Sequence, residues 1–183
     1  QGKLRNCKED WTTVLVIDDV KADIEEWLIN FVEVPHPALG NWAPCPYARK
    51  ARLDNKYTVR LGSQDLWRDL FEVAQEGMED QDVIIYAYDP DRFPTASLFE
   101  SVVDHANQFH LQWHDMIALA DHPQSPEVVN GVKFNQGKYA LVLVQSHTKL
   151  HSHATILADK GYYDGWDEEY LQDVFAHRTD PRK

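Results

Sequence analysis

Two short apolar runs constrain the fold of this chain most strongly. Residues 139–144 (Tyr-Ala-Leu-Val-Leu-Val) and 83–88 (Val-Ile-Ile-Tyr-Ala-Tyr) are almost continuously apolar, and Asp89-Pro90 ends the earlier run. Runs of this length without alternation are typical of strands that are buried on both faces in the middle of a sheet. The sequence therefore predicts a layered protein whose central strands are covered on both sides.

Helical and strand patterns alternate along the rest of the chain. Shorter strands are predicted at residues 58–61 and 116–120. Apolar residues at helical spacing predict five helices, which begin near Val20, Ser63, Ser97, Thr148 and Trp166. Strands separated by helices pair in parallel through crossover connections, whereas the last two strands have no helix between them. We therefore expect an α+β fold of ferredoxin-like character, with one mixed sheet of about four strands and helices packed on it.

The third helix and the last one carry signals at their ends. Ser97 and Glu100 form a capping box, and the inward face of this third helix is predicted to carry Leu98, Val102, Ala106, Phe109 and Trp113. His177 and Arg178 fall in the last turn predicted for the final helix, where cations complement the helix dipole.

The length of 183 residues predicts a single domain. We expect residues 1–17 to be an N-terminal extension and residues 121–137 to be a long connection between the last two strands. Within that connection, Asn130-Gly131 is a strong type I′ hairpin signal. A connection of this length is expected to be a lid over a site or an arm that embraces a partner.

The formal net charge of −12 argues against two classes of partner. Binding to nucleic acid or to anionic membranes depends on clustered Lys and Arg, so neither partner is expected. No apolar run approaches the roughly 20 residues of a membrane span, and the N-terminus has no apolar signal core. Two cysteines, Cys7 and Cys45, do not make a disulfide framework, which favours a cytoplasmic location.

The segment around Cys45 is the first candidate site. Pro44 and Pro46 restrict the backbone on both sides of the thiol. Three cations follow, at Arg49, Lys50 and Arg52. A thiol held near positive charge is the usual environment of a nucleophilic cysteine. The alternative is that Cys45 only packs, in a turn that lays Trp42 and Tyr47 into the core.

Two histidines provide candidate partners for this thiol. His147 follows the predicted central strand, and His151 lies one helical turn later on the same face. They are candidate catalytic bases beside Cys45. Together with His114 they are also candidate ligands of a divalent transition metal. The alternative is that they are ordinary polar residues at the start of a helix.

Four cations are candidate substrate-binding residues: Arg49, Arg52, Lys133 and Lys138. A basic pocket in an acidic protein would attract a carboxylate or phosphate ligand, so the leading hypothesis is a small-molecule enzyme or binder for an anionic metabolite. The rival hypothesis is a non-catalytic interaction or oligomerisation module, such as a homo-oligomer. It would use the 121–137 hairpin and the aromatic residues Tyr162, Tyr163 and Trp166 as an exposed surface.

One segment resembles a known family. A helix that ends in Glu-Trp-Leu-Ile-Asn-Phe-Val (residues 26–32) is followed by Pro-Cys-Pro-Tyr-Ala-Arg (residues 44–49). Over residues 24–52 this resembles an uncharacterised bacterial protein family in which a Trp-Ile or Trp-Leu helix leads into a Cys-Pro-Phe-Ala-Arg/Lys segment. The resemblance implies a compatible order of helices and strands, and it supplies no activity.

Overall fold

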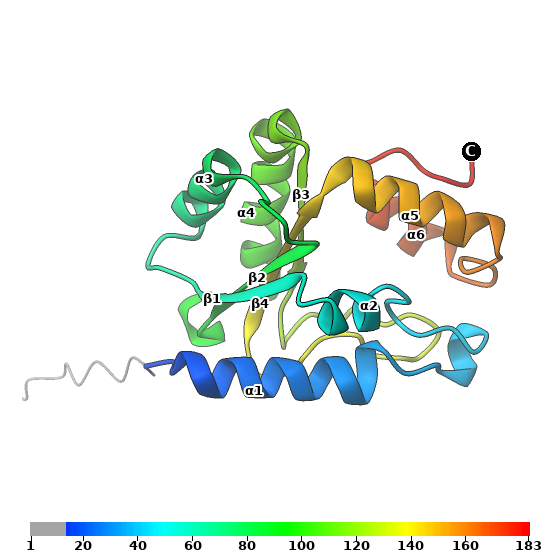
Figure 1. Cartoon of the computed structure of the whole chain (residues 1–183), viewed down its shortest axis with the longest axis horizontal. Coiled ribbons are helices and arrows are strands. Elements are labelled where there is room, and N and C mark those ends of the chain that lie inside the picture. Colours follow the sequence, from blue (N-terminus) through cyan, green and yellow to red (C-terminus); the bar gives the residue numbers. More distant parts are fainter. Residues whose placement is uncertain (1–13) are drawn as a thin grey trace, which may run out of the picture.

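The structure is a computed structural model that describes residues 14–183. Residues 1–13, with Cys7 and most of the predicted N-terminal extension, lie outside the described residues. The strands β1 (Tyr57–Leu61), β2 (Val83–Tyr88), β3 (Met116–Asp121) and β4 (Ala140–Ser146) form one sheet in the order β1-β2-β4-β3. β1 and β2 are parallel, whereas β4 is antiparallel to both of its neighbours (Figure 1). The prediction of an α+β fold of ferredoxin-like character with one mixed four-stranded sheet is confirmed.

The two apolar runs of the sequence occupy the two central positions of this sheet. β2 pairs with β4 over its whole length, with Ile85 opposite Leu143. Ile84, Ile85 and Leu141 expose about 1% of their surface or less. The central strands therefore carry the core, as their unbroken apolar character predicts.

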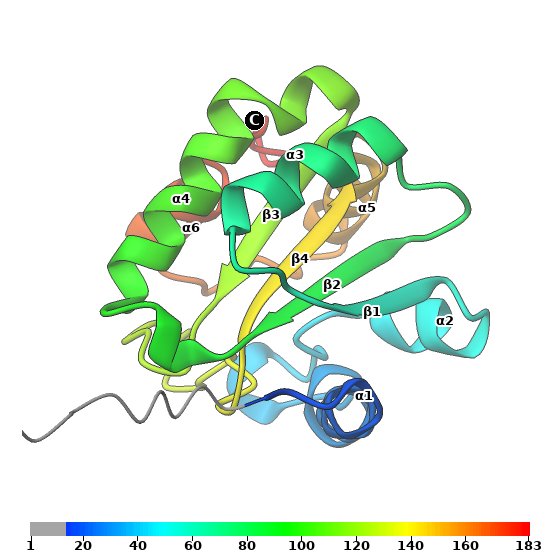
Figure 2. The ribbon, with the colours of Figure 1, turned by 90° about the vertical axis from the view of Figure 1, so that its left-hand side faces the viewer.

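Helices cover both faces of the sheet. On one face lies α1 (Ile17–Trp27), which continues into a π-helical turn (Leu28–Val32) and buries Val20 and Ile24 against β2 and β4. On the other face lie α3 (Leu66–Glu76) and α4 (Ala96–Phe109), side by side (Figure 2). None of the helices in residues 14–183 is both long and apolar enough to span a bilayer.

A smaller apolar cluster lies at one end of the sheet. α5 (His147–Asp159) leaves β4 directly and packs against α6 (Glu168–Val174), and the short helix α2 (Ala48–Leu53) lies nearby (Figure 1). The buried residues of this cluster are Ala154, Leu157, Tyr162, Tyr163, Leu171 and Phe175.

The predicted inward face of the third helix, α4, is wrong at three of its five positions, whereas Ala106 is buried and Val102 packs against the core. Phe99, Val103 and Ala106 point into the core, whereas Leu98, Phe109 and Trp113 are 48%, 60% and 83% exposed. The inward face includes Asn107, a buried polar residue, and its presence interrupts the apolar pattern from which the face was predicted. Asn107 donates to the carbonyl of Ala118 (2.8 Å) and accepts from its N–H (2.7 Å), so the amide satisfies the outer edge of β3.

Other features of α4 also differ from the prediction. Its N-cap is Thr95 and not Ser97. The Oγ1 of Thr95 accepts a hydrogen bond from the N–H of Leu98 at 3.1 Å. The helix ends at Phe109, and a 3₁₀ turn (Leu111–His114) carries Trp113 and His114 away from its axis.

The long connection between β3 and β4 is held against the chain itself. Asn130 and Gly131 have φ angles of 50° and 79°, and Val129 and Val132 exchange two backbone hydrogen bonds of 2.9 Å, which confirms the hairpin. Both valines are buried, together with Leu39 from the 3₁₀ turn Pro37–Leu39. The hairpin therefore packs intramolecularly and is not a free arm.

Gly62 allows Tyr88 to pack beside the end of β1, and its replacement tests that contact. A Cβ atom at position 62 would lie 1.9 Å from Cε1 of Tyr88, a ring that is 1% exposed. We expect Gly62→Ala to lower the free energy of unfolding by about 1–3 kcal/mol or more in denaturant titrations, because the ring of Tyr88 must shift. In a Tyr88→Ala background the same change should cost much less, and equal costs in both backgrounds would contradict the steric account.

Asp121, at the base of the long connection, gives the stability a defined pH dependence. Burial raises the pKa of this carboxyl to about 7, although it accepts the N–H of Gln136 at 3.0 Å. A pKa above the unfolded value favours the protonated folded state, so this contribution to stability is full below about pH 4 and is lost as pH rises to 7.

The variant Asp121→Asn removes that titration. In urea titrations the wild type should lose up to about 3 kcal/mol relative to Asp121→Asn between pH 4.5 and 7.5, at about 1.4 kcal/mol for each pH unit. The exposed Asp91→Asn is the matched control and should follow the wild type. Parallel profiles for Asp121→Asn and wild type would refute the assignment.

Candidate functional site

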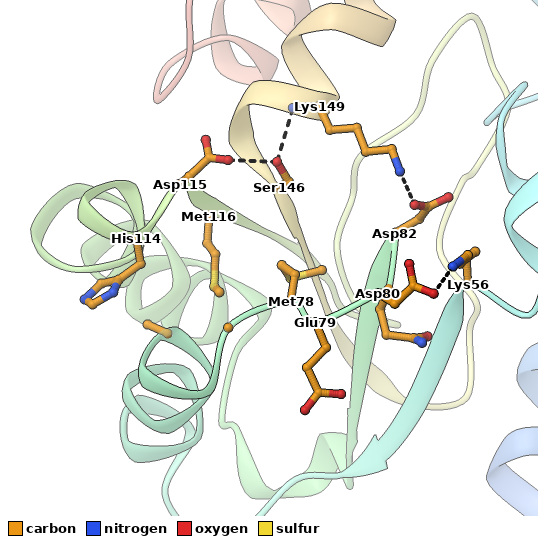
Figure 3. A pocket seen from close by; sticks show the side chains of 13 residues that line it. Lys56, Met78, Glu79, Asp80, Asp82, His114, Asp115, Met116, Ser146 and Lys149 are labelled. Carbon is orange, nitrogen blue, oxygen red and sulfur yellow. Dashed lines mark hydrogen bonds and ion pairs between the residues drawn. The ribbon is translucent and has the colours of Figure 1, made fainter.

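The start of α5 lies between two cavities. The first, of about 550 Å³, is lined by residues 77–82 and by His114, Asp115, Ser146 and Lys149, and we call it the acidic cavity (Figure 3). The second, of about 640 Å³, is lined by the six residues Gln108, Gln112, His147, His177, Arg178 and Thr179, together with Ala176. We call it the Arg178 cavity. Successive residues at the end of β4 and the start of α5 therefore face different cavities.

Asp115 fixes the first turn of α5. It has a left-handed φ of 53° and precedes β3. Its carboxylate accepts the hydroxyl of Ser146 (2.9 Å) and the N–H and hydroxyl of Thr148 (2.9 and 2.7 Å), and its carbonyl accepts the N–H of His147 (2.8 Å). Desolvation opposes ionisation, but the hydrogen bonds from Thr148 and Ser146 outweigh it and keep the pKa of Asp115 below its usual value.

The charges of the acidic cavity are largely paired with one another. Lys56 pairs with Asp80, and Lys149 reaches across the opening to Asp82 (Figure 3). The partly buried Met78 and the buried Met116 form part of the wall. Because both lysines already have carboxylate partners, this cavity offers little positive charge to an incoming anion.

Arg178, one of the residues that line the second cavity, is a cation of a different kind. The guanidinium of Arg178 is largely buried, and desolvation lowers its pKa. Its Nε donates to the carbonyl of Val174 at 3.0 Å, and its Cζ lies 4.8 Å from the ring centre of Phe175. Within residues 14–183 no carboxylate forms an ion pair with it. A desolvated guanidinium without a counter-ion is costly and favours an anion beside it.

Two histidines line the same cavity. The Nε2 atom of His147 is buried and has no hydrogen-bond partner among the described residues. His177 has its Nε2 3.5 Å from Oδ1 of Asp104, and its carbonyl accepts from Nε2 of Gln112 at 3.0 Å. Four other described side chains, His151 and Trp166 among them, also carry a buried polar atom without a partner, so this atom does not by itself mark a ligand site.

The environment of Cys45 differs from the prediction. The residue is exposed, yet desolvation around its sulfur raises the pKa of the thiol, and the charge of Glu33 acts in the same direction. Two of the three cations that follow are paired with carboxylates: Arg52 binds Glu33 with two hydrogen bonds (2.7 and 2.9 Å), and Lys50 pairs with Asp54. A thiolate stabilised by these cations stays a prediction, and these pairs do not support it.

The buried ring nitrogens of the two predicted bases, Nε2 of His147 and Nδ1 of His151, have no hydrogen-bond partner among the described residues, so neither nitrogen bonds to Cys45. The Cys45 segment meets α5 through Tyr47, whose ring stacks on His153 at 3.8 Å. It also meets the residues after α5, since the hydroxyl of Tyr162 donates to the carbonyl of Pro44 at 2.6 Å. His147 opens the helix and lines the Arg178 cavity, and Cys45 is not a lining residue of that cavity. The Nδ1 of His151 is buried without a partner in the described residues, and this residue lines neither cavity.

The four predicted substrate-binding cations do not gather in one place. Arg52 is paired with Glu33, Lys138 pairs with Asp23 of α1, and Lys133 donates to the carbonyl of Pro123 at 3.2 Å. Arg49 is exposed on α2. None of the four lines either cavity.

The predicted metal ligands are not assembled either. His114 lines the acidic cavity, whereas His147 lines the Arg178 cavity. In the described part of the chain, no group of three or more His, Cys, Asp or Glu side chains is placed to hold a metal ion.

The aromatic surface expected of an interaction module is largely inside the protein. Tyr162 and Tyr163 are 5% and 9% exposed, and Trp166 is half-buried. Trp166 packs edge-on against Phe134 of the long connection at 6.2 Å. These aromatic residues therefore join the connection to the α5–α6 cluster instead of facing a partner.

The sequence interpretation missed the residue that distinguishes the Arg178 cavity. The prediction treated Arg178 as a partner of a helix dipole, and part of this is correct, because it does bond to the carbonyl of Val174 at the end of α6. Its burial depends on residues distant in sequence, and no local pattern indicates it.

Comparisons with protein-family models, with curated proteins and with solved structures give no match to this chain. The resemblance of residues 24–52 to an uncharacterised bacterial family stays a prediction. The geometry of the cavities is thus the basis for a functional proposal.

The reactivity of Cys45 is directly testable in a Cys7→Ser variant, where it is the remaining thiol. Because desolvation raises the pKa of this thiol, we expect an apparent pKa above the ordinary value of about 8.5 in pH-dependent alkylation. Alkylation at pH 7 should be slower in the native protein than in urea. Faster alkylation of the native protein would contradict the structure and restore the nucleophile hypothesis.

Proposed function

We propose that this protein binds a small anionic molecule in the Arg178 cavity. The observation that carries the proposal is the buried guanidinium of Arg178, which lacks a carboxylate partner among residues 14–183. The class of ligand is the one expected from the sequence, an anionic metabolite, but the binding residues differ. Of the residues predicted from sequence, His147 belongs to this site, and Cys45, Arg49 and Lys133 do not.

The energetics of a buried charge support this proposal. A guanidinium that has lost water recovers the cost when a carboxylate or phosphate accepts two parallel hydrogen bonds from it. The Nε–H of Arg178 is already used by Val174, which leaves the two terminal amino groups for a ligand. The Phe175 ring lies over the guanidinium and restricts its orientation.

The other lining groups support a ligand with several acceptor atoms. Gln108 and Gln112 come from α4 and the turn after it, Thr179 comes from the C-terminal segment, and all three carry polar hydrogen-bonding side chains. A volume of about 640 Å³ is within the range of small-molecule sites. A cytoplasmic location for this ligand-binding protein is part of the same proposal and rests on its cysteine content.

The test is binding of inorganic phosphate, measured by calorimetry at fixed ionic strength. Arg178→Gln should weaken phosphate binding about tenfold to hundredfold, because a hydrogen bond to a charged group contributes about 1.5–3 kcal/mol. Arg178→Lys keeps the positive charge but loses the planar pair of N–H donors, so it should give an intermediate loss of phosphate affinity.

Arg49→Gln is the matched control, since Arg49 is an exposed arginine outside the cavity. It should leave the phosphate dissociation constant unchanged. If Arg49→Gln weakens binding as much as Arg178→Gln, the effect reflects overall charge and the proposed site is wrong. Absence of phosphate binding by the folded wild type would also overturn the proposal for this ligand.

A further inference from the structure

Each imidazole of the Arg178 cavity has a carboxylate near it that does not line the cavity. Asp104 of α4 lies 3.5 Å from Nε2 of His177. Asp115 lies close enough to His147 for the histidine charge to help lower the pKa of the carboxyl. Neither Asp104 nor Asp115 is among the lining residues. His147, His177 and Arg178 thus line the cavity, and the two carboxylates do not.

The charged groups around the imidazoles oppose one another. A neighbouring carboxylate favours the imidazolium form of a histidine, and a neighbouring cation disfavours it. His147 has Asp115 at the start of β3 and shares its cavity with Arg178 of the C-terminal segment. His177 has Asp104 on α4 and Arg178 as its neighbour in the chain. The lining residues contributed by α4 and the turn after it, Gln108 and Gln112, are neutral.

A bound anion changes this balance. Negative charge in the cavity neutralises the field of Arg178 and adds to that of the two carboxylates, so it favours protonation of both imidazoles. Binding of an anion and uptake of a proton therefore reinforce each other.

We infer that anion binding in the Arg178 cavity is linked to protonation of His147 and His177, so that affinity rises as the pH falls. This inference rests on the proposed function and adds its regulation. The histidines supply positive charge when the ligand is present and avoid the cost of three cations in an empty cavity.

Sulfate is the suitable probe, because it stays a dianion across the working range, so that any pH dependence belongs to the protein. We expect the sulfate dissociation constant to be at least about tenfold larger at pH 8 than at pH 5.5, the change produced by one linked proton over one pH unit. Calorimetry at pH 6.5 in two buffers of different ionisation enthalpy should show net proton uptake on binding.

Two kinds of variant assign the protons to these residues. His147→Gln and His177→Gln should each reduce the pH dependence and the proton uptake, and Asp104→Asn should reduce them without changing a lining residue. His105→Gln, a change on α4 outside the cavity, is the matched control. Asp121→Asn should keep the full pH dependence, because Asp121 also lies outside the cavity.

The outcomes separate the two proposals. Sulfate binding that depends on Arg178 but is equal at pH 5.5 and pH 8 would overturn proton linkage and leave the anion site intact. Equal loss of pH dependence in His105→Gln and His147→Gln would overturn the assignment to the cavity histidines. Absence of sulfate binding at both values of pH, with the protein folded, would overturn the anion site itself.

Discussion

The hydrogen bonds of Asp115 fix the corner of the fold on which both cavities depend. β3 begins beside this residue and α5 begins beside its partner strand, with Met116 opposite Ser146 in the sheet. The carboxylate and carbonyl of Asp115 together bind Ser146, His147 and Thr148. The first turn of a helix has N–H groups without intrahelical partners, and here a residue from another element satisfies two of them. The direction in which α5 leaves the sheet is thereby fixed, and with it the side to which His147 faces.

The pairing of charges distinguishes the two cavities that meet at this corner. In the acidic cavity the lysines and aspartates satisfy one another, and several of these groups are exposed, so the ion pairs are screened and contribute little to stability. Arg178 lines the other cavity, and its largely buried guanidinium lies over the ring of Phe175. A counter-charge matters far more for this group, because little water reaches it. The number of charged residues therefore does not point to the proposed ligand site, whereas the desolvation of a single cation does.

The parts of the structure that could be predicted from sequence depend on local patterns. The strands at residues 83–88 and 140–146 follow from unbroken apolar runs, and the Asn130-Gly131 turn follows from its need for positive φ angles. The inward face of α4 was predicted wrongly because Asn107 is buried there by two bonds to β3, a contact between distant residues. His147 was chosen as a candidate site residue on the same kind of local evidence, because it follows the end of a central strand.

The charges around the candidate sites could not be predicted in the same way. The cations after Cys45 appear free in the sequence, yet Glu33 from the turn after α1 binds Arg52 and contributes to the raised pKa of the thiol. Arg178 shows the opposite case, since acidic residues surround it in the sequence at Asp173 and Asp180, yet Asp180 pairs with Arg182 and Lys183. Which charge meets which is decided by packing between elements, and helical or strand periodicity carries no information about it.

The acidity of the chain also bears on how an anion could be bound at all. With a formal charge of −12 the long-range field repels anions, but at physiological salt it is screened beyond about 8 Å. Recognition must then come from groups in direct contact with the anion. Several permanent cations held close together would be destabilising whenever no ligand is bound, whereas imidazoles can gain their charge together with the ligand. A site with one arginine and two histidines would therefore let an acidic protein bind an anion with fewer unpaired positive charges when no ligand is present.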